Sequence, residues 1–145
     1  MIERYDSIIV DITCRIMVPF IQLFGMYVIF HGHYSPGGGF QGGVLLASSM
    51  ILHRLSLGYK ESYLKLPPAR ASVLGTGGMF LFILTALTPI FFGGVFLDYG
   101  FLPIPGLEPA ELRYYGILIA EIWIGIAVFG CLVVIFDRLT ERRLD

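Results

Sequence analysis

Long apolar segments alternate along the chain with short polar or glycine-rich ones. A helix that crosses a bilayer needs about 20 mostly apolar residues, and four segments approach that length: 12–30, 40–57, 71–92 and 115–136. The pattern predicts an all-α integral membrane protein, a bundle of four transmembrane helices in one domain that covers residues 1–145. Because no small-residue cleavage site follows the first segment, we expect that segment to be retained.

Composition supports the membrane class and excludes one class of partner. Hydrophobic residues make up 56% of the chain and charged residues only 14%, whereas soluble proteins carry about 25% charged residues. So small a globule could not hide this much apolar surface from water. The net charge of −1 leaves no basic surface for a nucleic acid, so we expect no nucleic-acid partner.

The positive charges predict the orientation, because short loops rich in Lys and Arg stay on the cytoplasmic side of a membrane. Nine of the ten Lys and Arg residues fall on one side of the four predicted spans: Arg4, Arg15, Arg54, Lys60, Lys65, Arg70, Arg138, Arg142 and Arg143. The opposite side has only Arg113. We therefore expect both termini to be cytoplasmic, with a basic connection over 58–70.

The connection between the first two predicted spans is unusually rich in glycine. It reads HGHYSPGGGFQGG over residues 31–43. Each glycine inside a helix costs about 1 kcal/mol relative to alanine, so some interaction must offset that cost. Gly39, Gly43 and Ala47 recur every four residues and form the kind of small-residue face that lets two helix backbones approach closely in lipid. We expect the second helix to pack inside the bundle.

Three interpretations of this connection are considered. A phosphate-binding loop is disfavoured, because the Gly-Lys-Ser/Thr sequence is missing. A tight turn followed by a closely packed helix is purely structural. Alternatively, main-chain amides at the start of the helix, together with His31 and His33, line a route for ions or protons.

Two further sets of polar residues lie in the predicted spans. Glu121 is placed about six residues inside the fourth span, roughly 9 Å from its outer end. An acid at that depth is part of a proton or cation path, is hydrogen-bonded between helices, or extends its side chain to the membrane surface. In the first span, one stripe holds Asp11, Arg15, Pro19 and Gln22, and within it Asp11 and Arg15 can form an ion pair.

Alternatives from other functional classes rest on weaker patterns. Ser49 and His53 lie four residues apart and could form the nucleophile and base of a small intramembrane serine hydrolase. No orienting acid is evident for such a pair. A metal site at His31 and His33 is disfavoured, because His53, the third histidine, is predicted to lie at the opposite membrane face. A self-sufficient homo-oligomeric channel is the third alternative.

The string GHYSPGGGFQGG, together with a last helix that carries an acid in the run GILIAEIWIGIAVFG, resembles the B subunit of Mrp/Mnh-type multisubunit sodium/proton antiporters. The resemblance extends to the homologous subunit of membrane-bound hydrogenase and sulfur-reductase complexes, and it covers the whole chain. The residues that match the motif are His33, Pro36, Gly37, Gly38, Gly39, Phe40, Gln41, Gly42 and Gly43.

The resemblance implies a non-catalytic membrane subunit of a multisubunit cation/proton antiporter, either one that stands alone or one coupled to a hydrogenase-type complex, in the cell membrane of a prokaryote. We expect no cofactor, no bound metal and no enzymatic turnover. The partners implied are other membrane subunits, the lipid bilayer, sodium ions and protons. The candidates for an ion or proton path are Glu121, His31, His33, Asp11 and Arg15.

Overall fold

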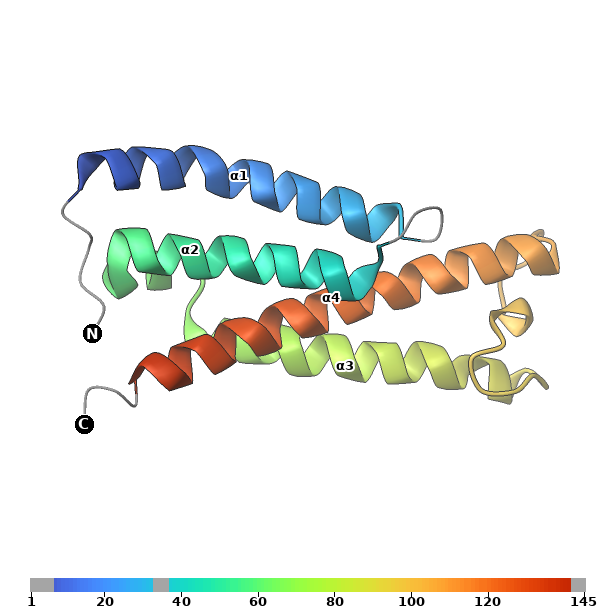
Figure 1. Ribbon diagram of the computed structural model, residues 1–145. Coiled ribbons are helices and arrows are strands. Elements are labelled where there is room, and N and C mark those ends of the chain that lie inside the picture. The colour runs from blue at the N-terminus through green and yellow to red at the C-terminus, as the bar shows by residue number, and fades with distance from the viewer. Residues whose placement is uncertain (1–6, 33–36, 142–145) are drawn as a thin grey trace.

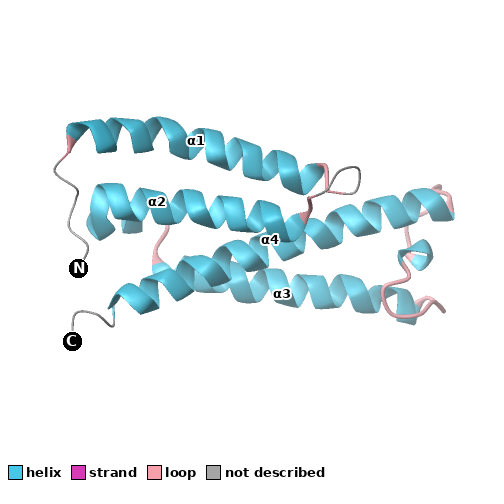
Figure 2. Cartoon of the chain, in the orientation of Figure 1, coloured by secondary structure: helices cyan, strands magenta, loops and turns pink. Residues whose placement is uncertain are grey.

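The computed structural model describes residues 7–32 and 37–141, and all of the regular structure in these two ranges is helical. The prediction of an all-α fold is confirmed for these residues (Figure 2). They form four long helices and one short 3-10 helix: α1 (Ile8–Phe30), α2 (Gly39–Lys65), α3 (Pro68–Phe91), η1 (Tyr99–Phe101) and α4 (Pro109–Glu141).

The long helices lie side by side in the order α1, α2, α4, α3 (Figure 1). α2 packs on α1 and on α4, and α4 also packs on α3, whereas α1 has little contact with α4. The start of α1, the α2–α3 connection and the end of α4 lie at the same end of the bundle. We call this the basic end, because it holds Lys60, Lys65, Arg70 and Arg138.

The glycines at the start of α2 lie directly against the backbone of α4. A Cβ atom at Gly39 would overlap the main-chain carbonyl of Glu121, and one at Gly43 would lie 2.6 Å from the carbonyl oxygen of Gly125. Ala47, one turn further along the same face, is completely buried. The predicted small-residue face is therefore present, and the two backbones touch because no side chain separates them.

Small residues mark the other helix contacts as well. Where α1 crosses α2, a Cβ at Gly42 would lie 2.7 Å from the carbonyl oxygen of Gly25. Where α3 crosses α4, a Cβ at Gly78 would lie 2.6 Å from the amide nitrogen of Ala127. The face of α4 that carries Gly125 thus contacts α2, and the face that carries Ala127 contacts α3.

The prediction of a loop over 58–70 is wrong. Gly58 interrupts α2 with φ 76° and ψ 169°, a conformation that glycine adopts far more readily than other residues, and the chain then returns to helix as far as Lys65. α3 begins at Pro68, where the missing N–H of proline costs nothing because the first turn leaves it unpaired. The connection between the two helices is therefore only residues 66–67.

The connection before α4 is also more ordered than the sequence suggests. η1 lies within it, and the Tyr99 side chain packs so closely on Gly116 that a Cβ there would overlap the ring. α4 begins at Pro109, six residues before the predicted start at position 115. Figure 1 shows that this added length carries α4 beyond the start of α2.

Among the described residues, three helices are long and apolar enough to cross a membrane: α1, α3 and residues Pro109–Thr140 of α4. Their outward surfaces are apolar: Phe20 of α1 is 64% exposed, Phe91 of α3 is 82% exposed and Ile135 of α4 is 52% exposed. α2 is as long but more polar, since it contains glycines, serines, His53 and Arg54. It lies between α1 and α4 and carries much of the buried surface of the bundle.

The close α2–α4 contact predicts a difference between two glycine-to-valine substitutions. Gly39→Val should destabilise the bundle by about 1–3 kcal/mol, because the new side chain meets main-chain atoms that cannot rotate away. Gly77→Val is the matched control, since a Cβ at Gly77 meets no atom within 4 Å. Reversible unfolding of the chain in mixed detergent micelles measures both. Equal stability of the two variants would contradict the contact.

Candidate functional site

Glu121 lies where the α1–α2 connection meets the middle of α4. Its carboxylate is beside the backbone of Gly32 and Gly38: a Cβ at Gly32 would overlap the carboxylate, and a Cβ at Gly38 would lie 3.2 Å from Oε1. Gly38 directly precedes the first residue of α2. The acid is partly buried among main-chain atoms of a neighbouring segment.

The predicted depth of Glu121 needs correction. Because α4 begins at Pro109, Glu121 is twelve residues from the helix start, about 18 Å along the axis, and not the six residues expected. The N-terminal part of α4 continues beyond α2 (Figure 1), so the acid is level with the connection between α1 and α2. The start of α2, where the N–H groups of the first turn have no partner within the helix, lies beside it.

At the basic end, a buried ion pair joins α2 to α4. Arg54 is 0% exposed in its side chain and pairs with Asp137, which is 4% exposed. Arg54 also donates to the main-chain oxygen of Leu66 at 3.0 Å, and its guanidinium lies over the Tyr63 ring, 5.0 Å from the centroid. One side chain thus ties together α2, α4 and the α2–α3 connection.

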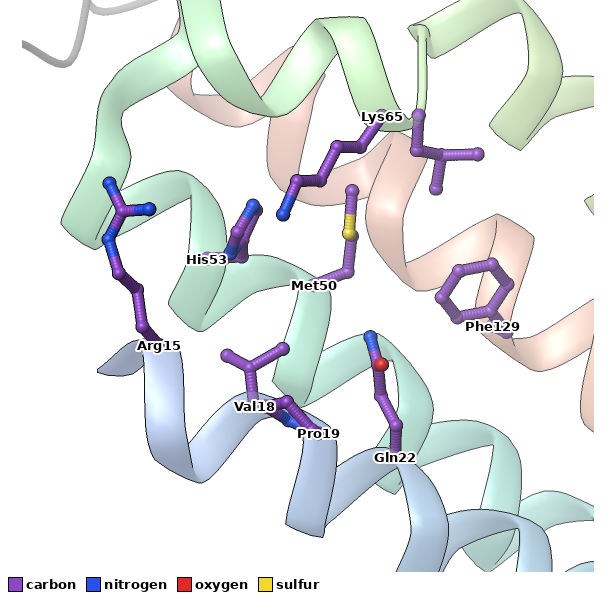
Figure 3. A pocket seen from close by; sticks show the side chains of 9 residues that line it. Arg15, Val18, Pro19, Gln22, Met50, His53, Lys65 and Phe129 are labelled. Carbon is purple, nitrogen blue, oxygen red and sulfur yellow. The ribbon is translucent and has the colours of Figure 1, made fainter. Parts of the chain in front are cut away.

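The polar stripe of α1 faces α2. Arg15 Nε donates to Asp11 Oδ1 at 3.0 Å, so the expected pair is present, and an Arg15 terminal nitrogen lies 3.8 Å from Glu61 Oε2 on α2. Arg15, Pro19 and Gln22 line a pocket of about 520 Å³ between α1, α2 and α4 (Figure 3). Asp11 and Arg15 are thus at the basic end, whereas Glu121 is near the other end of α2.

A family described as "Domain related to MnhB subunit of Na+/H+ antiporter" matches residues 9–134. The chain belongs to this MnhB-related family. Three similar bacterial proteins share the name "Putative antiporter subunit mnhB2". They are 34% identical in Staphylococcus haemolyticus, 32% in Staphylococcus saprophyticus and 31% in Staphylococcus aureus strain Newman. Each alignment covers 97% of this chain and 99% of the relative.

Membership in the MnhB-related family and the apolar helices together identify a multi-pass membrane protein. The matched region includes the glycine-rich connection, both faces of the α2–α4 contact and most of α4. The resemblance seen in the sequence is therefore confirmed, and it concerns the segments that build the site around Glu121.

Only part of the family motif packs within this chain. Gly38, Gly39, Gly42 and Gly43 are buried, whereas Phe40 is 63% exposed. Gln41 is also exposed and Gly37 is half-buried. Phe40 and Gln41 therefore take no part in the packing of α2 inside the bundle, because they lie on its outer side.

Of the two histidines in the glycine-rich connection, only His31 lies among the described residues. The exposed His31 ring stacks on Tyr27 with centroids 4.2 Å apart, and its Nδ1 lies 3.2 Å from the Tyr27 main-chain oxygen. The predictions for His33 and Pro36 lie outside the described residues. Within the described ranges, no group of three or more His, Cys, Asp or Glu side chains could hold a metal ion.

The serine hydrolase alternative gains no support from the geometry. The Ser49 hydroxyl is fully buried and donates to the main-chain oxygen of Leu46 at 2.7 Å. Among the described residues, neither ring nitrogen of His53 has a hydrogen-bond partner. A serine nucleophile must donate a hydrogen bond to its base, whereas the Ser49 hydroxyl donates to a main-chain oxygen of its own helix.

Sequence reasoning missed the pair of Arg54 and Asp137. Arg54 was counted only as a positive charge on the cytoplasmic side, and Asp137 directly follows the predicted fourth span, yet both are buried. A signal was present, because the predicted second span is the only one with a histidine and an arginine near its end, four and three residues before Leu57. An arginine so close to the apolar run needs an acidic partner from another span.

Removing either Arg54 or Asp137 alone should lower the stability of the bundle. Arg54→Met leaves the Asp137 carboxylate buried without its counter-charge, and we expect a loss of about 3–5 kcal/mol in unfolding free energy. The double variant Arg54→Met with Asp137→Leu should regain most of that loss.

Arg70→Met is the control, because Arg70 is exposed in the first turn of α3, and it should change stability by less than about 0.5 kcal/mol. Unfolding titrations of the four proteins in detergent give the comparison. If the double variant were no more stable than Arg54→Met alone, the two side chains would not act as a pair.

Proposed function

We propose that this MnhB-related chain is a non-catalytic subunit of a multisubunit Na⁺/H⁺ antiporter, in which it packs against other membrane subunits and holds Glu121 as part of an ion or proton path. The observation that carries the proposal is the contact of the Glu121 carboxylate with the backbone at the start of α2. The three staphylococcal relatives, whose names describe antiporter subunits, support the assignment to such a complex.

The position of Glu121 suits an ionisable group that exchanges a proton or a cation. Placing an acidic side chain at membrane depth costs free energy, so such a side chain faces protein or water. Here glycines on the facing segment let the carboxylate approach main-chain atoms at the start of α2 directly. A partly buried carboxylate beside main-chain atoms can bind a proton or a sodium ion in turn.

The outer surface of the bundle supports a role as one subunit among several. Large apolar side chains on α1, on α3 and in the connection before α4 are exposed, including Phe24, Phe80, Phe91 and Phe96. Such a surface requires lipid or other membrane helices as neighbours. Four long helices are also few for a transporter that works alone.

For the topology, we propose four spans with both termini in the cytoplasm. α2 runs beside α1 and α4 over its length (Figure 1), so it shares their depth although it is more polar. Lys60, Lys65, Arg70 and Arg138 lie at one end of the bundle, and the positive-inside rule puts that end in the cytoplasm.

The function of Glu121 is tested by Glu121→Gln in the assembled complex. Glutamine keeps the shape of the side chain but cannot take up and release a proton, so we expect sodium-driven proton exchange to fall by about tenfold or more. Fluorescence of a pH-gradient dye in everted membrane vesicles, followed on addition of sodium, measures the exchange.

Glu108→Gln is the control for the loss of one carboxylate, since Glu108 is exposed just before α4. It should leave exchange unchanged. Purification in mild detergent must show that both variants still associate with the other subunits. Normal exchange by Glu121→Gln in an intact complex would remove the role in the ion path, whereas purification of the wild-type chain as a homo-oligomer would contradict the subunit assignment itself.

The proposed topology predicts opposite labelling of two introduced cysteines. In a chain whose Cys14 and Cys131 are replaced by alanine, Lys60→Cys should react with a membrane-impermeant maleimide only in everted vesicles. Glu108→Cys should react only in right-side-out vesicles. Reaction of both cysteines from the same side would rule out four spans with the predicted orientation.

A further inference from the structure

A pocket of about 520 Å³ opens between α1, α2 and α4 near the basic end. Figure 3 shows that side chains of two helices converge on it: Arg15, Pro19 and Gln22 come from α1, and His53 and Lys65 come from α2. Neither the packing role of the chain nor the proposed path at Glu121 uses this pocket. It is a separate feature of the fold.

The polar part of the pocket is cationic. Arg15 and Lys65 line it, and none of its lining residues is acidic. Asp11 and Glu61 lie close enough to Arg15 to offset part of its charge. Within the described part of the chain, however, Lys65 takes part in no ion pair. The Lys65 ammonium is therefore the cationic group of the pocket that no carboxylate of the described residues pairs with.

His53 adds a buried group that lacks an internal partner. Its side chain is at the wall of the pocket between Arg15 and Lys65 (Figure 3), and the residue is only 4% exposed. Neither ring nitrogen has a hydrogen-bond partner among the described residues. Burial of a polar group is unfavourable unless it is hydrogen-bonded, so a ligand that accepts a hydrogen bond from His53 would be stabilised here.

The remainder of the pocket is apolar, with Val18, Met50, Leu66 and Phe129 as its wall. A small inorganic anion would use the basic side and leave this wall exposed. An amphiphile with an anionic head would use both. The pocket also lies beside the basic end of helices that cross a membrane, which is the depth at which phospholipid headgroups meet protein, and basic pockets between helices on the cytoplasmic side are suited to anionic lipids.

We propose that this pocket binds the phosphodiester headgroup of an anionic phospholipid. Lys65 and Arg15 contact the phosphate oxygens, and His53 donates a hydrogen bond from its ring N–H. The glycerol and the first methylene groups of the acyl chains lie against Val18, Met50 and Phe129. The lipid would thereby fill the space between α1 and the rest of the bundle, where α1 has little contact with α4.

A photoreactive phosphatidylglycerol, with a diazirine near the headgroup, tests the site in the assembled complex in lipid nanodiscs. The wild-type chain should be cross-linked at residues of the pocket, mapped by mass spectrometry. Lys65→Gln should lower this labelling about fivefold, because one basic residue near the surface contributes that much to the binding of anionic lipid. Lys60→Gln, which removes an exposed lysine five residues away that does not line the pocket, should leave labelling unchanged.

Two comparisons identify the ligand. A phosphatidylcholine probe with the same diazirine should label the pocket weakly, and millimolar inorganic phosphate should compete no better than potassium chloride at equal ionic strength. The proposal is overturned if Lys65→Gln and Lys60→Gln label alike, if the two lipids label equally, or if inorganic phosphate alone displaces the probe. Labelling of Glu121→Gln should match wild type, so this result is independent of the proposed ion path.

Discussion

The direct contact between the backbones of α2 and α4 is the interaction on which the rest of the structure depends. Gly39 and Gly43 on one helix meet Glu121 and Gly125 on the other, and any larger side chain would force the two helices apart. Close approach gains dispersion energy along the contact and offsets the poor helix propensity of the glycines. It also brings the Glu121 carboxylate to the start of α2, so one contact serves both packing and the candidate site.

The α2–α4 contact is fixed a second time at the basic end, by the buried pair of Arg54 and Asp137. Between the two fixed points, Ala47 and Met50 of α2 form the core with Ala71 of α3 and Val133 of α4. This arrangement explains why α2 can be the most polar of the four long helices in the described chain. Its glycines, its serine at position 49 and its arginine are satisfied by α1, by α4 or by its own turns, and little of its surface needs to be apolar.

Much of the fold could be predicted from the sequence, because lipid imposes a simple rule on length and hydrophobicity. The glycine repeat also predicted a close helix contact, although it could not say which helix supplies the partner. Helix ends were less predictable. A run of charged residues such as 60–65 reads as a loop by its polarity, but local helix propensity and the special conformation of Gly58 decide its structure. The Arg54–Asp137 pair and the pocket beside His53 form where segments distant in the sequence pack together. The periodicity of a single segment carries no information about such contacts.

The central claim is that the glycine face of α2 rests on α4 of the same chain when the protein is in its membrane complex. A cryo-electron microscopy structure of the complex in lipid nanodiscs measures this directly. We expect Gly39 and Gly43 to lie in main-chain contact with Glu121 and Gly125, with no density between the two helices. Lipid or a helix of another subunit between α2 and α4 would contradict it.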